Sequence, residues 1–296
     1  MAEIALHCGK WRAMVRPELG GALTRCEIER NGSWLPLLRS TSTEAGDVLE
    51  TACFPVAPFF GRLRGGRFVF RGREIVLPPI GPHPTPLHGF VWRMPWQIDT
   101  STDAALTLAC AHHAGAWPWP FTTTQTFELD GGGLTISLVV RNSGHEAMPC
   151  GIGLHPCFPC DAATRLFADV EAEVALDSGV LPIDPAPTGR VAITEDMRLQ
   201  RRALHRSGMD CSFEGWTGTA VIEQPALGYR LRLTASPAIS RLHVYAPSDD
   251  DCFCVEPVSH AIDAFNLDEA DLAKAGVRVL APGESQRMQM RLSLDP

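Results

Sequence analysis

The sequence predicts a large all-β sandwich that forms one domain over residues 1–296, with few short helices. Short β-prone segments separated by turn residues recur almost from end to end. The 26 glycines and 24 prolines are spread along the chain and leave little room for long helices. The sequence shows neither strand–helix alternation nor a repeat of fixed period, so we expect antiparallel sheets packed face to face.

The strands are predicted in pairs around turns. Arg71-Gly72 separates two alternating segments, as expected for a tight hairpin that Pro78-Pro79 ends. The final segment alternates apolar Met288, Met290 and Leu292 with polar residues, which is typical of a half-buried strand. The predicted pairs are 67–70 with 73–77, 122–129 with 134–140, 219–223 with 229–234, and 277–280 with 287–294.

One helix is predicted over residues 267–275. Asn266 is a suitable N-cap, and Asp268 and Glu269 place negative charge in the first turn. Gly276 suits the end of the helix. A second short helix is expected near residues 43–50.

Charge and hydropathy exclude several partners. The chain has 26 basic and 34 acidic residues, a net charge of −8, which disfavours nucleic acid. No apolar run reaches the roughly 18 residues that a membrane span needs. The first fifteen residues lack the apolar core of a secretion signal. We therefore expect a cytoplasmic protein without membrane or nucleic-acid partners.

The ten cysteines are expected to be reduced thiols in such a compartment. Cys157 and Cys160 form a CxxC that encloses Phe158-Pro159, and Cys252 and Cys254 form a CxC. A zinc site needs two suitably spaced pairs without prolines in the knuckle. We predict that these cysteines pack as small apolar residues and that the chain has no structural metal.

Five segments do not read as ordinary strands and turns. Alternation places His155 on the same face as Gly151 and Gly153, so we expect it to project from a face that is bare of side chains. Alternation also points Glu256 away from the face of Phe253 and Val255. Taken alone, such a histidine or glutamate is more often a packed or solvated residue. The segments are 61–67, 86–90, 151–159, 209–216 and 252–260.

Proline follows both polar residues. Pro156 and Pro257 are expected to terminate the two strands just beyond His155 and Glu256. Strand ends that open on a cleft are suitable positions for an acid and a base.

Together these segments resemble the aldose 1-epimerase (galactose mutarotase) family. The motifs that carry the resemblance occur in the order found in that family and span residues 62–266. The resemblance implies a β-supersandwich with a sugar-binding cleft, and interconversion of the α and β anomers of a free aldohexose such as glucose or galactose. It implies no cofactor and no metal. The motifs are Leu87-His-Gly-Phe90, Gly151-Ile-Gly-Leu-His-Pro156, Asp210-Cys-Ser-Phe-Glu-Gly-Trp216, and Glu256-Pro-Val-Ser-His260 followed by Asp263-Ala-Phe-Asn266.

The resemblance also implies residue roles. Glu256 would take the proton from the anomeric hydroxyl, and His155 would protonate the ring oxygen. His88 would assist at these oxygens, while Arg62 and Asp210 would hold sugar hydroxyls. A glutamate is ordinarily ionised at neutral pH and a histidine is near its titration point, which matches the two roles.

The walls of the cleft are less well defined by the sequence. Trp216, Trp92 or Phe90 would offer an apolar surface to the sugar, although core packing is an equally good interpretation of each. Cys157 stands where the family usually has an aromatic residue, which predicts a smaller wall there.

Three alternatives remain open. A hexose-6-phosphate 1-epimerase would need cations at the phosphate, for which Arg64 and Arg67 are candidates. A non-catalytic sugar-binding module on the same fold would have no need for both His155 and Glu256. A hydrolase would ordinarily use two carboxylates, whereas these motifs supply one carboxylate and histidines. The partner expected in every case is a small sugar, and the chain is expected to be a monomer or a homodimer.

Overall fold

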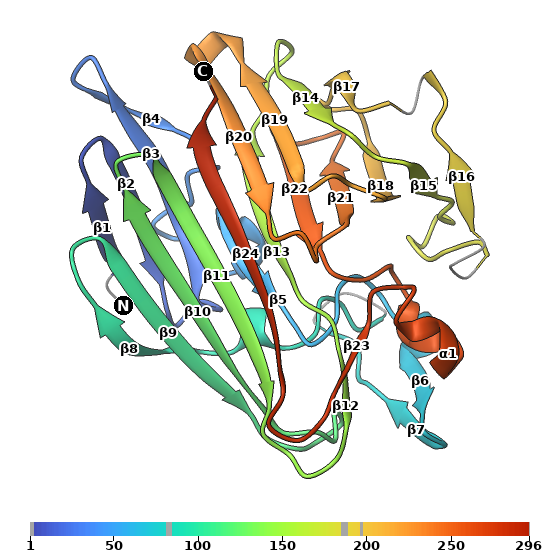
Figure 1. Cartoon of the computed structure of the whole chain (residues 1–296). Coiled ribbons are helices and arrows are strands. Elements are labelled where there is room, and N and C mark those ends of the chain that lie inside the picture. The colour runs from blue at the N-terminus through green and yellow to red at the C-terminus, as the bar shows by residue number, and fades with distance from the viewer. Residues whose placement is uncertain (1–2, 81–84, 185–188, 196–197, 296) are drawn as a thin grey trace.

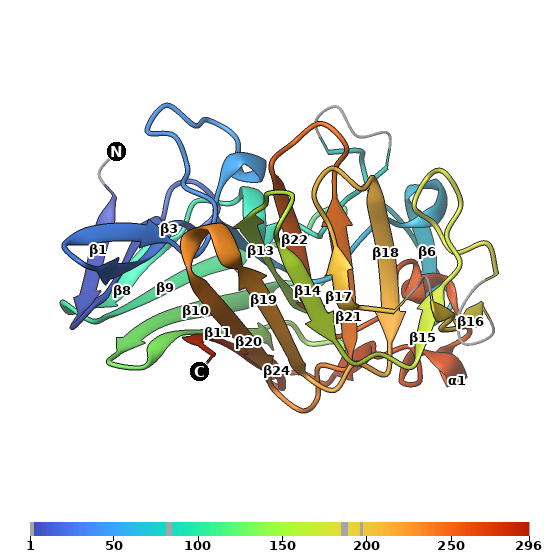
Figure 2. The ribbon, with the colours of Figure 1, turned by 90° about the horizontal axis from the view of Figure 1, so that it is seen from above.

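The computed structural model describes residues 3–80, 85–184, 189–195 and 198–295, and it confirms the predicted all-β sandwich. Two large antiparallel sheets of eleven and nine strands pack face to face. Figure 1 shows their strands crossing in front of one another, and Figure 2 shows the same sheets as two layers. No helix among the described residues is long and apolar enough to cross a membrane.

The eleven-stranded sheet has β13 and β22 at its centre. Its order is β1 (Ile4–Cys8), β2 (Trp11–Arg16), β3 (Ala22–Arg30), β5 (Cys53–Val56), β13 (Gly153–Pro159), β22 (Cys252–Val258), β21 (Arg241–Ala246), β18 (Met209–Glu214), β15 (Ala172–Val174) and β16 (Arg190–Ala192), with β4 (Ser33–Pro36) paired to β3.

The nine-stranded sheet covers one face of the larger sheet. Its order is β17 (Gln200–Ala203), β14 (Arg165–Ala168), β19 (Thr219–Gln224), β20 (Tyr229–Ala235), β24 (Ser285–Leu294), β11 (Gly133–Asn142), β10 (Phe121–Asp130), β9 (Ala105–His112) and β8 (Gln97–Ser101). Two small sheets complete the fold: β6 (Arg67–Phe70) with β7 (Arg73–Val76), and β12 (Met148–Cys150) with β23 (Arg278–Leu280).

The main core lies between the two large sheets because alternate residues of each strand face inward. On β24, Met288, Met290 and Leu292 are buried among residues of both sheets, while the residues between them are more exposed. On β22, Phe253 and Val255 point into this core. The other face of β22, which carries Glu256, is therefore available for a site outside the core.

The predicted hairpins 67–70 with 73–77, 122–129 with 134–140, and 219–223 with 229–234 are confirmed as β6–β7, β10–β11 and β19–β20. The fourth pair forms two strands that do not pair with each other. Instead β23 pairs with β12, and β24 lies between β11 and β20. Ala281-Pro-Gly-Glu284 thus connects two different sheets rather than closing a hairpin.

The predicted helices are shorter than expected. The α-helix α1 spans only Glu269–Leu272, and its N-cap is Asp268. Asn266 instead ends the 3₁₀ helix Ala264–Asn266, where its amide donates to the Asp263 carboxylate at 2.7 Å. The helix expected near 43–50 is a 3₁₀ turn, Val48–Glu50, with a capping box between Asp47 and Glu50. The remaining described 3₁₀ helices are Arg64–Gly66, Val91–Arg93 and Pro225–Leu227.

Candidate active site

A cavity of about 520 Å³ opens on the face of the eleven-stranded sheet that points away from the main core. Strands β13, β18, β21 and β22 form its floor, and loops from both halves of the chain form its rim. The five residues to which the family resemblance gave roles at the site all line this cavity: Arg62, His88, His155, Asp210 and Glu256. Its volume lies in the range of small-molecule sites.

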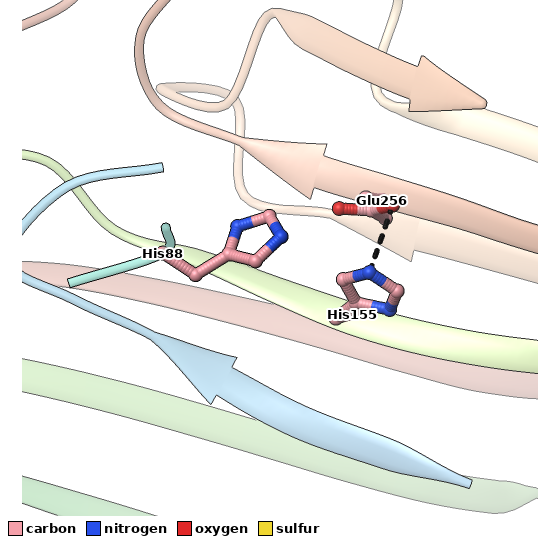
Figure 3. Close-up of side chains that lie close together, drawn as sticks. All are labelled: His88, His155 and Glu256. Atoms are coloured by element: carbon pink, nitrogen blue, oxygen red, sulfur yellow. Dashed lines mark ion pairs between the residues drawn. The ribbon is translucent and has the colours of Figure 1, made fainter. Parts of the chain in front are cut away.

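His155 and Glu256 meet at the centre of the floor. They lie on adjacent antiparallel strands, and the flanking register pairs Gly153 with Val258 and Cys157 with Cys254. His155 Nε2 lies 3.2 Å from Glu256 Oε1 (Figure 3). The side chains are 12% and 1% exposed, so the pair is almost completely removed from water.

Burial shifts the pKa values of both groups toward their uncharged forms. Desolvation, with a smaller contribution from Asp210, raises the pKa of Glu256 well above its usual range. Desolvation, followed by the charges of His243 and Arg39, lowers the pKa of His155 to about 3. The ordinary behaviour of the two residue types, an ionised glutamate and a histidine near its titration point at neutral pH, does not hold for this buried pair.

These shifts make the charged forms scarce but more reactive. A carboxylate with a raised pKa is a stronger base once ionised, and an imidazolium with a lowered pKa is a stronger acid once formed. Because the two groups are in contact, they titrate as a pair. A pair that shares one proton is a suitable acid–base unit.

Backbone contacts orient His88 beside this pair (Figure 3). The Gly61 amide donates to His88 Nδ1 at 3.3 Å, so the neutral ring carries its proton on Nε2. The His88 and His155 ring centres lie 5.4 Å apart. His88 has a φ of 56°, and Gly89 follows at 70°. A Cβ on Gly89 would lie 2.0 Å from the Ala57 carbonyl oxygen, so only glycine permits this turn.

Asp210 is held by a neighbour that the sequence analysis missed. His243 Nε2 lies 3.0 Å from Asp210 Oδ1, and His243 Nδ1 lies 2.8 Å from the Ser212 hydroxyl. His243 is opposite Glu256 in the register of β21 and β22. The alternation of Arg241, His243 and Tyr245 along β21 was the available sequence signal, but it does not indicate which face meets the cavity.

Arg39 is a second cavity residue that the sequence analysis missed. Its guanidinium donates to the carbonyl oxygens of Leu49 and Thr51, and the structure gives it no carboxylate partner among the described residues. Arg64 and Arg67 are candidates only for the alternative phosphate site, and a place on the surface of the hairpin is the stronger expectation for both. They are engaged elsewhere. Arg64 lies 3.3 Å from Asp263, and Arg67 lies 3.4 Å from Glu74 on the β6–β7 hairpin.

Two local predictions about strands β13 and β22 are wrong. Pro156 and Pro257 do not terminate their strands, because β13 continues to Pro159 and β22 to Val258. Residues 151 and 153 do not leave an open face either. A Cβ on Gly151 would lie 1.7 Å from the His260 ring, and a Cβ on Gly153 would lie 2.9 Å from Val258. The glycines admit these neighbours rather than a ligand.

His260, which follows β22, forms a hydrogen bond to the rim of the cavity. The Phe60 amide donates to His260 Nε2 at 2.9 Å, and His260 Nδ1 lies 2.6 Å from the Ala261 carbonyl oxygen. The ring is therefore neutral with its proton on Nδ1. This contact positions Phe60 and Gly61, which precede Arg62 on the rim.

The aromatic lining of the cavity differs from the expectation. Phe60 and Tyr245 line it, whereas Trp216, Trp92 and Phe90 do not. Trp92 is fully buried and stacks on Phe54. Phe54 in turn stacks on His155 with ring centres 4.3 Å apart. Trp92 therefore packs behind the ring that contacts His155, without lining the cavity itself.

Two groups in the cavity offer metal ligands. One ligand atom from each of His88, His155 and Glu256 lies within 4.8 Å of the others. Cys157 meets Cys252 and Cys254 on the floor. Sequence reasoning had considered Cys157 with Cys160, and it did not foresee that β13 and β22 would bring these three thiols together.

Comparisons with known proteins identify the family and the fold. Residues 4–293 match the family described as aldose 1-epimerase. The chain is 33% identical over 272 residues to the uncharacterised protein YphB of Escherichia coli K12, covering 88% of this chain and 89% of YphB. A crystal structure from Escherichia coli K12, provisionally described as an aldose 1-epimerase, has a TM-score of 0.88 at 30% identity and 99% coverage of both chains. A galactose 1-epimerase from Lactobacillus acidophilus shares the fold, with a TM-score of 0.78 at 15% identity, covering 99% of this chain and 94% of that one.

Proposed function

The chain belongs to the aldose 1-epimerase family, and from that premise we propose that it interconverts the α and β anomers of a free aldohexose such as glucose or galactose. The observation that carries the proposal is the His155–Glu256 contact of 3.2 Å at the floor of the cavity. Ring opening removes a proton from one oxygen and delivers a proton to another, so it needs an acid and a base at one bond.

In the proposed reaction, Glu256 accepts the proton of the anomeric hydroxyl while His155 protonates the ring oxygen. The bond between C1 and the ring oxygen breaks and leaves an aldehyde. Rotation about C1–C2 and closure on the other face of the carbonyl give the opposite anomer. Protons return along the same path, so the pair ends each cycle with the proton it began with.

The other cavity residues bind the sugar in this scheme. His88 Nε2–H is a donor suited to the ring or anomeric oxygen. Asp210 accepts from sugar hydroxyls, with His243 holding the carboxylate in place. Arg62 offers donors at the rim. Phe60 and Tyr245 supply the apolar surface that a pyranose face needs.

One observation favours a second candidate, an epimerase acting on a hexose 6-phosphate. Arg39 lines the cavity and has no carboxylate partner among the described residues. Arg64 and Arg67 give this candidate no support, because both are paired outside the cavity lining. Asp249 and Asp250 on the rim disfavour a dianionic phosphate. We therefore place the free sugar first.

Polarimetry tests the proposal. Freshly dissolved α-glucose and α-galactose are followed with and without protein, at a pH where spontaneous mutarotation is slow. Faster decay to the same final rotation supports the epimerase, and the ratio of rates compares the two sugars. Unchanged decay with both sugars, together with acceleration for glucose 6-phosphate, supports the second candidate. Sugar binding without any acceleration would leave the chain as a binding module.

A further inference from the structure

Three cysteines form a thiol cluster on the floor of the cavity, defined here as Cys157, Cys252 and Cys254. Cys157 Sγ lies 3.0 Å from Cys254 Sγ, and it donates to Cys252 Sγ at 3.6 Å. The three residues form a small buried group of their own, separate from the main core. Their exposed fractions are 3%, 6% and 2%, yet all three line the cavity. A small ion that enters the cavity therefore reaches these sulfurs.

The cluster is contiguous with the His155–Glu256 pair because of strand alternation. Cys157 follows His155 by two residues on β13, and Cys254 precedes Glu256 by two residues on β22, so each thiol shares a face with its polar neighbour. Cys157 and Cys254 are direct partners in the register. A ligand held by these thiols would lie beside the His155–Glu256 pair.

Arg39 supplies a positive charge beside the cluster, and Asp250 supplies a negative one. Arg39 Nη1 lies 3.5 Å from Cys252 Sγ, and no carboxylate among the described residues pairs with Arg39. The Cys252 thiol donates to the Asp250 carboxylate at 3.0 Å. A metal ion that binds two of these thiols displaces their protons.

We propose that the thiol cluster binds one soft monovalent cation of low coordination number, Cu(I), through Cys157 and its neighbouring cysteines. Thiolate sulfur is the preferred ligand of Cu(I). Binding through two sulfurs releases two thiol protons to solvent and leaves a complex of charge −1. The Arg39 guanidinium compensates this charge, and no electron is transferred.

The number of converging ligands favours such an ion over zinc. A metal bonded to two sulfurs at about 2.3 Å each holds them at most about 4.6 Å apart, so the separations of 3.0 Å and 3.6 Å would widen as the ion enters. Structural zinc needs four converging ligands. Among the described residues, only His88, His155 and Glu256 form a group of three in which every ligand atom lies within 4.8 Å of the others. The thiols therefore suit two-coordinate binding, and the histidines suit a borderline divalent ion.

The test is titration of the reduced, full-length protein with Cu(I) under anaerobic conditions, in competition with a chromophoric Cu(I) chelator. We expect one tight equivalent in the wild type. Cys157→Ala removes the sulfur that the two contacts share. We expect the affinity for Cu(I) to fall by more than the roughly 10–100-fold that follows removal of a residue that only hydrogen-bonds a metal ligand. Cys254→Ser serves as a second variant if Cys157→Ala fails to fold. Cys110→Ala is the matched control, because Cys110 is buried in β9 and does not line the cavity.

The outcomes separate this proposal from the proposed function. Retention of tight binding in Cys110→Ala and its loss in Cys157→Ala and Cys254→Ser support the cluster as the site. Equal binding by all four proteins overturns the proposal, as does loss of binding in His88→Asn with retention in Cys157→Ala. Inhibition of mutarotation by one equivalent of Cu(I) is a further consequence that rests on the proposed function. Absence of any mutarotase activity leaves the binding result intact.

Discussion

His155 and Glu256 contact each other, and each has one further polar atom that is left without a partner among the described residues. His155 Nδ1 and Glu256 Oε2 are buried without a hydrogen-bond partner among the described residues. Such atoms are costly in a folded protein, and they are common where a substrate completes the site. Sugar hydroxyls both donate and accept hydrogen bonds, so they can pair with His155 Nδ1 and with Glu256 Oε2.

Replacing either member of the pair should remove the chemistry and keep the fold. We expect Glu256→Gln and His155→Asn each to lower kcat by at least about 10²-fold, because a positioned acid or base contributes roughly 10²–10⁴-fold. Polarimetry measures the rate, and circular dichroism checks the fold. Glu171→Gln is the control, because the Glu171 side chain is 73% exposed and pairs with Arg190. Near-wild-type turnover in Glu256→Gln would assign the base to another residue.

The pKa shifts predict an unusual pH profile. The pair carries one proton between the lowered pKa of His155, about 3, and the raised pKa of Glu256. The active form needs that proton, so kcat/KM should show no acid limb near pH 6.5, and it should fall on the alkaline side once Glu256 loses its proton. The measurement is the enzymatic rate above the spontaneous rate at each pH. An acid limb centred near pH 6.5 would show that His155 titrates normally and would refute this account.

At the scale of elements, the rim of the cavity depends on one packing contact. The loop after β5 is joined to the segment after β22 by the Phe60–His260 hydrogen bond. Gly151 leaves the space that the His260 ring fills. The predicted polar face of residues 151–155 is therefore partly a packing surface, although alternation placed His155 correctly on the cavity side.

Gly151→Ala should disturb this joint. The new Cβ would lie 1.7 Å from His260 Cδ2 and 2.3 Å from Nε2, the atom that accepts the Phe60 amide. Overpacking of this kind costs about 1–3 kcal/mol of unfolding free energy. Displacement of the rim should also raise KM for the sugar more than it lowers kcat. Urea unfolding and polarimetry measure the two effects.

Gly131→Ala is the control for this substitution, since a Cβ there meets nothing within 4 Å. It lies in the β10–β11 turn, remote from the residues that line the cavity. If Gly151→Ala matches Gly131→Ala in both stability and KM, the His260 ring has room to move, and the Phe60–His260 contact does not hold the rim rigidly.

At the scale of the whole molecule, buried neutral histidines make stability depend on pH. Burial lowers the pKa of His260 to about 4, below the value of roughly 6.5 expected in an unfolded chain. Between these values the unfolded chain binds a proton that the folded chain does not. Stability therefore falls as pH drops through this window. Glu256 acts in the opposite direction, because its raised pKa favours the folded state on the acid side.

Comparison of variants isolates the His260 contribution. From pH 6 to pH 5, the wild type should lose up to about 1.4 kcal/mol more unfolding free energy per pH unit than His260→Gln, which corresponds to one proton. Urea unfolding at several pH values measures the slopes. His113→Gln is the control, since His113 is exposed, and it should retain the wild-type slope. Parallel slopes in the wild type and His260→Gln would mean that His260 titrates normally in the folded state.

The sequence by itself determined the class of fold and the identity of five of the polar residues at the cavity, whereas Arg39 and His243 were missed. Alternation along segments such as 287–294, and turn residues such as Arg71-Gly72, act between near neighbours, so they can be read from local sequence. The ordered motifs around His88, His155, Asp210 and Glu256 were identified through their resemblance to the family, and all four residues line one cavity.

Only the tertiary structure decided how distant segments meet. Strand pairing places Cys157 opposite Cys254, His243 opposite Glu256, and β23 beside β12 rather than β24. These partners are separated by 13 residues or more, and no local pattern encodes their register. The pKa values of His155 and Glu256 likewise depend on contacts between distant segments. They follow from desolvation, which arises only when the sheets and loops close around the pair.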